Sequence, residues 1–238
     1  MSFLAFQNHT WPVVGGGGGI TEVGRAQTSG AMNVIGDPDI SGISMQDDDV
    51  ILVFISLSSN IDRNPSVSGY TVLADIRAND NFDSHTWVGY LRVSGTPPTT
   101  VTLTWGSSTS QSAAIATVLV LRGVDTTTIE DVTGINDSGP NTGLISPASI
   151  TPVTPGAWIM TFATTAHDQG GSVVHTVTGG EYDTFNSYSG NASVHDVTAS
   201  IAIKEWSSGA FAPTPWGLSV SDSATYSRGV QTIAVRPA

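Results

Sequence analysis

The residues best suited to holding a metal ion form a short run of alternating amide and carboxylate side chains, Asn79, Asn81 and Asp83. Alternate residues of a loop can direct several oxygens at one Ca²⁺, but this run lacks the glycine and the distal glutamate of an EF-hand loop. Asn and Asp also bond their own backbone in turns, and this simpler interpretation competes with calcium here and at the acidic run 47–49. We therefore predict no cofactor, with Ca²⁺ as an open alternative.

Residues that could break bonds are present, but their spacing does not suit catalysis. Of the four glutamates, Glu181 and Glu205 would best suit a glycosidase, yet nothing in the sequence pairs them. The five histidines show neither His-x-His nor His-Glu-x-x-His spacing, and no Gly-x-Ser-x-Gly elbow occurs. The glycine run 15–19 lacks the Lys-Ser/Thr of a phosphate loop. These patterns predict a protein that is not an enzyme.

Tryptophans are the side chains most able to stack on a sugar ring, and the chain has six. Four of them (Trp87, Trp105, Trp158 and Trp206) fall at repeated strand positions, which favours packing in the core or at a strand end. Trp216 lies between Pro215 and Gly217, so it is the best candidate for an exposed tryptophan and for a glycan contact.

The first 19 residues read as an arm. Phe3, Phe6 and Trp11 are apolar anchors, and the glycine run that follows them is typical of a flexible joint. Exposed aromatic side chains in a loose tail favour association, so we predict that the arm docks on a neighbouring subunit. A loosely packed N-terminus is the alternative.

Composition excludes several partners. The formal net charge is −12, from 20 acidic and 8 basic residues, which leaves no basic patch for nucleic acid. There is no cysteine, so disulfides and thiolate metal sites are excluded. The start of the chain lacks the pattern of a secretory signal, and no window is apolar enough for a membrane span. We expect a protein that is made in a cytoplasm and contacts neither nucleic acid nor membrane.

The elements that would position these residues are β-strands. The run 50–55 is continuous, apolar and β-branched, as in a strand buried on both faces, and 114–121 is a second such run. Residues 100–105 alternate polar and apolar, which indicates a half-buried strand. No stretch shows a sustained helical period with caps, so little helix is expected.

The second half of the chain repeats the plan of the first. Residues 158–162 correspond to 50–54, and 229–235 correspond to the strand that closes on Arg122, at offsets of about 110 residues. No linker of the kind found between domains separates the halves. We predict an all-β, antiparallel, jelly-roll-like sandwich at 20–238, built from pseudo-repeated halves at about 20–125 and 126–238. Two small sandwiches are the alternative.

The first half also resembles a group of β-sandwich proteins encoded by tailed phages and prophages. Their pattern is a Gly-Asp-type turn into a buried strand, a Gly-Trp or Gly-Tyr turn, an aromatic strand ending in Lys/Arg-Val, a Thr-x-Thr-Trp strand and an apolar strand ending in Arg-Gly-Val-Asp. Here the segments are Asp48-Asp49-Val50, Gly69-Tyr70, Trp87 to Val93, Thr102-Leu103-Thr104-Trp105 and Arg122-Gly123-Val124-Asp125. The resemblance covers 47–125 well and the second half in outline, and it departs where Asp48 replaces the usual Gly.

This resemblance implies a virion-associated structural protein and carries no catalytic residue with it. We expect a capsid decoration or cement protein that acts by non-covalent association, as a homo-oligomer, with the major capsid protein or other virion proteins as partners. The alternative is a tail or fibre protein that binds host-surface glycans, followed by a bacterial carbohydrate-binding or adhesion module.

Overall fold

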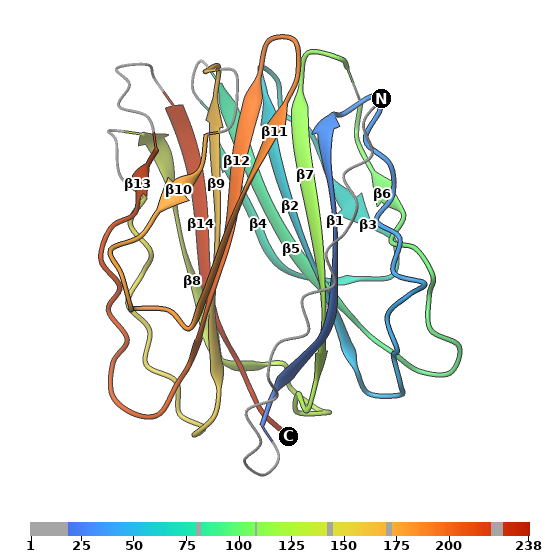
Figure 1. The fold of residues 1–238 in the computed structure, drawn as a ribbon, viewed down its shortest axis with the longest axis vertical. Coiled ribbons are helices and arrows are strands. Elements are labelled where there is room, and N and C mark those ends of the chain that lie inside the picture. Colours follow the sequence, from blue (N-terminus) through green and yellow to red (C-terminus); the bar gives the residue numbers. More distant parts are fainter. Residues whose placement is uncertain (1–18, 80–81, 108, 142–144, 170–172, 220–225) are drawn as a thin grey trace.

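A computed structural model describes residues 19–79, 82–107, 109–141, 145–169, 173–219 and 226–238 (Figure 1). These residues contain strands and no helix, and therefore no helix long and apolar enough to cross a membrane. The first half contains β1 (Thr21–Ala31), β2 (Val50–Ser59), β3 (Ser66–Val67), β4 (Thr71–Ala78), β5 (Asp83–Arg92), β6 (Leu103–Thr104) and β7 (Ala113–Arg122). The second half contains β8 (Glu130–Asn141), β9 (Trp158–His167), β10 (His175–Thr176), β11 (Thr184–Asn191), β12 (Asp196–Glu205), β13 (Gly217–Leu218) and β14 (Tyr226–Val235).

Each half of the chain forms one five-stranded antiparallel sheet. The order in the first sheet is β1-β7-β2-β5-β4, and the second sheet, read from β8, has the order β8-β14-β9-β12-β11. Every strand of the first half therefore has an equivalent in the second, including the two-stranded pairs β3-β6 and β10-β13. The chain completes one sheet before it begins the other. The fold therefore shares its two layers with a jelly roll, but not the way in which the strands are connected.

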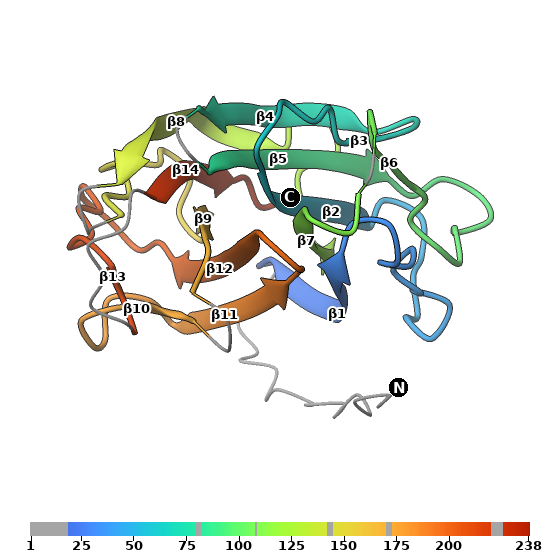
Figure 2. The same cartoon turned by 90° about the horizontal axis from the view of Figure 1, so that it is seen from above.

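The two sheets face each other and share one core (Figure 2). Phe54 and Phe162 occupy equivalent positions in β2 and β9, and their ring centroids lie 5.3 Å apart. Two residues further along the same strands, the hydroxyls of Ser56 and Thr164 are hydrogen-bonded at 2.8 Å. Equivalent residues meet in this way only on a two-fold axis. The halves are thus related by a pseudo-two-fold axis that runs along the strands.

Long loops cover the outer face of each sheet and create further apolar clusters. All ten residues of β2 and nine of the ten in β7 are buried, because loop residues such as Met32 and Ile40 pack on their outer side. The outer face of the second sheet is covered by loop residues that include Ile145, Ile150 and Trp216. The prediction that 50–55 and 114–121 are buried on both faces is confirmed.

The last residues of the chain fasten the two halves together at the turn that joins them. The amide of Asp125 donates to the carbonyl of Arg236 at 2.9 Å, and the amide of Ala238 donates to Gly123 at 2.8 Å. Gly123 has φ +78°, and a Cβ there would lie 2.6 Å from the carbonyl oxygen of Gly19. The glycine of the Arg-Gly-Val-Asp segment is therefore required by both conformation and space.

The all-β fold, the antiparallel sandwich and the pseudo-repeated halves are confirmed, and the two halves form one sandwich. Residues 1–18 of the predicted arm lie outside the described residues.

Candidate functional site

The predicted site residues have different outcomes. Phe3, Phe6 and Trp11 lie outside the described residues, and so does Asn81 of the calcium run. The other two candidates of that run lie on either side of the turn between β4 and β5: Asn79 is exposed and Asp83 is half-buried.

Asp83 lines a small hollow at one end of the first sheet, together with Arg63 and Arg77. The hollow has room for about one water molecule. Two guanidinium groups beside the carboxylate disfavour a divalent cation. Among the described residues, no group of three or more His, Asp or Glu side chains could hold a metal ion.

The prediction that Trp216 is exposed is wrong. Its side chain is fully buried on the outer face of the second sheet, where the rings of Tyr182 and Phe185 contact it edge-on at 5.6 Å and 5.2 Å. The backbone of Trp216 pairs with Ile145 in an isolated bridge, which fixes the loop over the sheet. Pro and Gly neighbours mark a loop, but they do not tell which side of the loop faces the protein. Trp216 therefore cannot be a glycan contact in this fold.

His85 lines the hollow, and both of its ring nitrogens have a partner. Its Nδ1 lies 2.7 Å from the carbonyl oxygen of Arg63, and its Nε2 lies 2.5 Å from a carboxylate oxygen of Asp75. Both partners are acceptors, so both contacts are hydrogen bonds only when a proton is shared between the second nitrogen and the carboxylate. Burial lowers the pKa of His85, and Asp75 acts in the opposite direction. With both nitrogens engaged, His85 has none left to accept a proton from a nucleophile.

A second histidine network lies within the second half and is closed to solvent. His175 is bonded through Nε2 to Thr165 at 2.9 Å and through Nδ1 to Ser200 at 2.7 Å. Ser200 in turn donates to Ser187, which also accepts from the backbone amide of His175. Burial lowers the pKa of His175 to about 3. The ring is therefore neutral at pH 7, and the serine–histidine contacts brace a loop rather than form an accessible catalytic pair.

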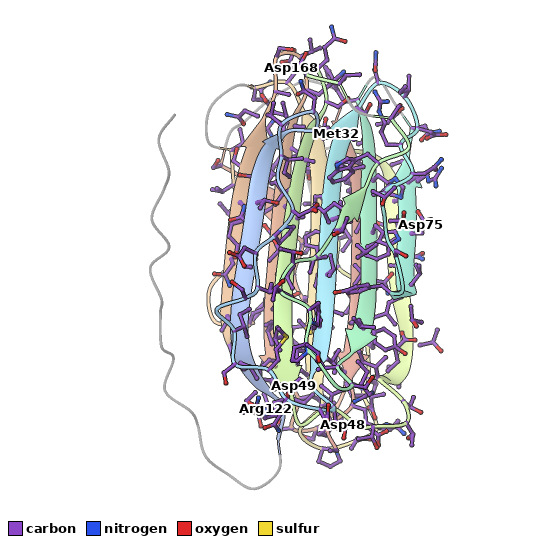
Figure 3. The ribbon with its side chains drawn as sticks, turned by 90° about the vertical axis from the view of Figure 1, so that its right-hand side faces the viewer. Met32, Asp48, Asp49, Asp75, Arg122 and Asp168 are labelled. Atoms are coloured by element: carbon purple, nitrogen blue, oxygen red, sulfur yellow. The ribbon has the colours of Figure 1, made fainter. Side chains whose placement is uncertain are left out.

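Each residue of the acidic run 47–49 has a structural role. Asp49 is buried and forms a two-point ion pair with Arg122, at 2.9 Å and 2.8 Å (Figure 3). Asp47 accepts from the amide of Gly95 at 2.8 Å. Asp48 has φ +70°, the only positive φ of a non-glycine residue among those described. These contacts support the interpretation of the run as a turn.

The backbone at Asp48 explains why glycine suits this turn. The equivalent residue of the second half is Gly156, with φ +82°. Both turns are closed by the same bond, from the amide of Asp48 to Val93 and from the amide of Gly156 to Trp206. The position needs a left-handed backbone, which glycine adopts freely and aspartate adopts at some cost.

The glutamates considered for catalysis are separate. Glu181 accepts from the amide of Thr214 at 3.0 Å. Glu205 lies at the end of β12 and is exposed, and its backbone amide donates to Asp183. Asp183 also pairs with Lys204 at 2.8 Å. Glu181 therefore belongs to the loop that leads into β11, whereas Glu205 ends β12.

Two features could not be singled out from the sequence. The contact between His85 and Asp75 joins neighbouring strands, so it depends on strand register rather than on spacing along the chain. The partner of Asp131 is also distant in sequence: Arg236 lies 3.2 Å from its carboxylate. Arg236 follows the last strand of the second half, and Arg122, at the equivalent place in the first half, pairs with Asp49. The one sign of this pair in the sequence was that the apolar runs of β7 and β14, the last long strands of their halves, are each followed by an arginine.

No protein-family model, curated protein or solved structure matches the chain.

Proposed function

We propose that this protein is a structural component of a bacteriophage virion, acting as a capsid decoration or cement protein by non-covalent association. One observation carries the proposal: several described side chains with the chemistry to react are bonded within the fold. Both nitrogens of His85 and of His175 have partners, and Asp49 and Asp131 are each held by an arginine. The proposal therefore places the function on the surface of the sandwich.

Three further points support this proposal. The segments that resemble the phage proteins form the turns and braces described above, as expected of a framework. The net charge of −12 suits a solvent-facing protein that must not bind the packaged nucleic acid. A repeating lattice would give each copy several neighbours, so weak contacts could add up to stable attachment.

The direct test is immunogold labelling of purified phage particles with an antibody against the full chain. Label distributed over the capsid is the expected result. Label confined to the tail or its tip would overturn the decoration role and favour the glycan-binding alternative. Particles without label would overturn a virion role altogether.

A binding experiment addresses the mechanism. The full chain should sediment with purified capsids that lack it, and a variant with Phe3, Phe6 and Trp11 changed to Ser should not. Trp216→Phe serves as the matched control, because it changes an aromatic residue that is buried. Addition of cell-surface polysaccharide should leave the tryptophan fluorescence of the full chain unchanged. Quenching would instead support glycan binding.

A further inference from the structure

The sandwich has four edge strands, and β4 carries two exposed residues of opposite charge, whereas the Glu22–Arg25 pair of β1 is largely buried. The edges are β1 and β4 in the first sheet and β8 and β11 in the second. In β4, Asp75 and Arg77 are exposed on the outer face, with a residue facing the core between them. The equivalent residues of β11 are Ser187 and Ser189, and Ser187 bonds to the loop that covers it. Figure 3 places Asp75 at the outer edge of the molecule.

From residue 74 to residue 78, β4 is paired with β5 in unbroken register. No described strand is hydrogen-bonded to its other edge, although β8 of the second sheet packs near β4. Such an edge presents backbone N–H and C=O groups that can pair with another chain. Asp75 and Arg77 lie 3.6 Å apart in an ion pair within the strand, and they retain 46% and 37% of their side-chain exposure, so both remain accessible to a neighbour. Val72, at the start of the strand, is 52% exposed.

We propose that β4 is a dimerisation edge, which pairs antiparallel with β4 of a second copy so that Ile76 lies opposite Ile76. Residues that oppose each other across an antiparallel pair point to the same face, so only registers that shift in steps of two are allowed around a two-fold axis. One neighbouring register sets Asp75 against Asp75, and the other sets Arg77 against Arg77. Only the register centred on residue 76 sets each Asp75 against an Arg77, in both copies at once.

The result is a ten-stranded sheet that continues across the dimer, with two opposite-charge pairs at its centre. Charges on an edge strand can also prevent pairing. Here the two residues have opposite signs, so the charges of two copies attract each other in the proposed register and repel each other in the two neighbouring registers. This inference stands apart from the proposed function, because it concerns the purified protein alone.

The test is sedimentation equilibrium of the full chain over a range of concentrations. The wild type should show a monomer–dimer equilibrium, and Arg77→Asp should weaken it on the order of tenfold because both charge pairs become repulsive. Lys204→Asp is the matched control, since it makes the same charge change on a strand inside the second sheet. A wild type that stays monomeric, or a dimer that Arg77→Asp leaves unchanged, overturns the proposal.

Complementary variants guard against a simple folding defect. Asp75→Arg and Arg77→Asp should each dimerise more weakly than the wild type alone, and should form a tighter mixed dimer when combined, because Arg then faces Asp at both pairs. For the register, Asp75→Cys mixed with Arg77→Cys should give a disulfide-linked heterodimer, while neither should link to itself; the chain has no other cysteine. A self-linked dimer of either variant would rule out the proposed register.

Discussion

The outer faces of the two sheets fill the same space by different means. In the first half the large side chain comes from the sheet: Trp87 in β5 lies over Gly89, where an added Cβ would sit 2.4 Å from the indole ring. In the second half the equivalent positions hold Ser200 and Ala202, and the indole is supplied by the covering loop, as Trp216. The two halves therefore share the strand order and the filled volume, but the large side chain comes from a strand in one half and from a loop in the other.

The polar content of these faces differs in the same way. Val53 and Leu57 of β2 belong to the apolar cluster under the first set of loops, whereas the equivalent residues of β9 are Thr161 and Thr165. The second face accordingly contains a hydrogen-bonded network around His175 beneath its covering loops. On the first face the buried polar bonds of His85 and Arg63 lie beside the hollow at one end of the sheet, and Val53 and Leu57 are packed in hydrocarbon.

Removal of either indole should give the largest effect. Trp87→Ala and Trp216→Ala should each lower the free energy of unfolding by about 3–5 kcal/mol, because each leaves a large cavity in a filled layer. Urea denaturation at pH 7 measures the change. Trp206→Ala is the control, because that residue is only half-buried. A loss below about 1 kcal/mol at either buried position would contradict the equivalence of the two indoles.

Acid should distinguish the two outer faces. An unfolded histidine has its pKa near 6.5 and His175 in the fold has it at about 3, so the unfolded chain binds the extra proton first. Stability is complete above pH 6.5 and falls as the pH drops toward 3, with a loss of about 2 kcal/mol at pH 5 from this residue. His175→Gln should abolish that part of the loss in urea titrations at pH 7 and 5. The matched change His85→Gln should alter the pH dependence less, because Asp75 opposes the effect of burial.

The contact between the sheets at Ser56 and Thr164 should show strong coupling. Ser56→Ala alone leaves the Thr164 hydroxyl buried without its partner, and should cost about 1–2 kcal/mol. The double variant Ser56→Ala/Thr164→Val should be close to neutral, because it removes both polar groups. Equal and additive losses in a double-mutant cycle would show that the two hydroxyls do not depend on each other.

The smallest expected effect concerns the left-handed turns. Asp48→Gly should be neutral or should stabilise the fold by up to about 1 kcal/mol, since glycine suits the conformation but is more flexible when unfolded. Gly156→Ala at the equivalent turn should destabilise by about 1–2 kcal/mol. Thermal unfolding of both variants measures the difference. A stabilising Gly156→Ala would show that the two turns are not equivalent.

The sequence was sufficient to predict the two layers and the internal repeat. It was insufficient to predict which side of a loop packs against the sheet. The apolar run of β2 and the arginines that close β7 and β14 follow from local pattern, because strand periodicity is a property of neighbouring residues. The burial of Trp216 and the pairing of Asp75 with His85 depend on how a loop or a strand lies against another, and spacing along the chain contains no such information. Asp48 is an intermediate case, since a sequence resemblance drew attention to the position, but the physical reason is its left-handed backbone, with φ +70°.

The axis between the halves also bears on how freely this chain can vary. Phe82 and His195 occupy equivalent positions, and their rings meet edge-on at 5.3 Å. In a true homodimer each substitution on the axis appears twice, so such a contact must be Phe on Phe or His on His. Because both halves belong to one polypeptide, each partner can change alone, and an unlike pair becomes accessible. Because the two halves are linked in one chain, the two residues that meet on the axis can differ in type, while the two sheets keep their symmetric arrangement.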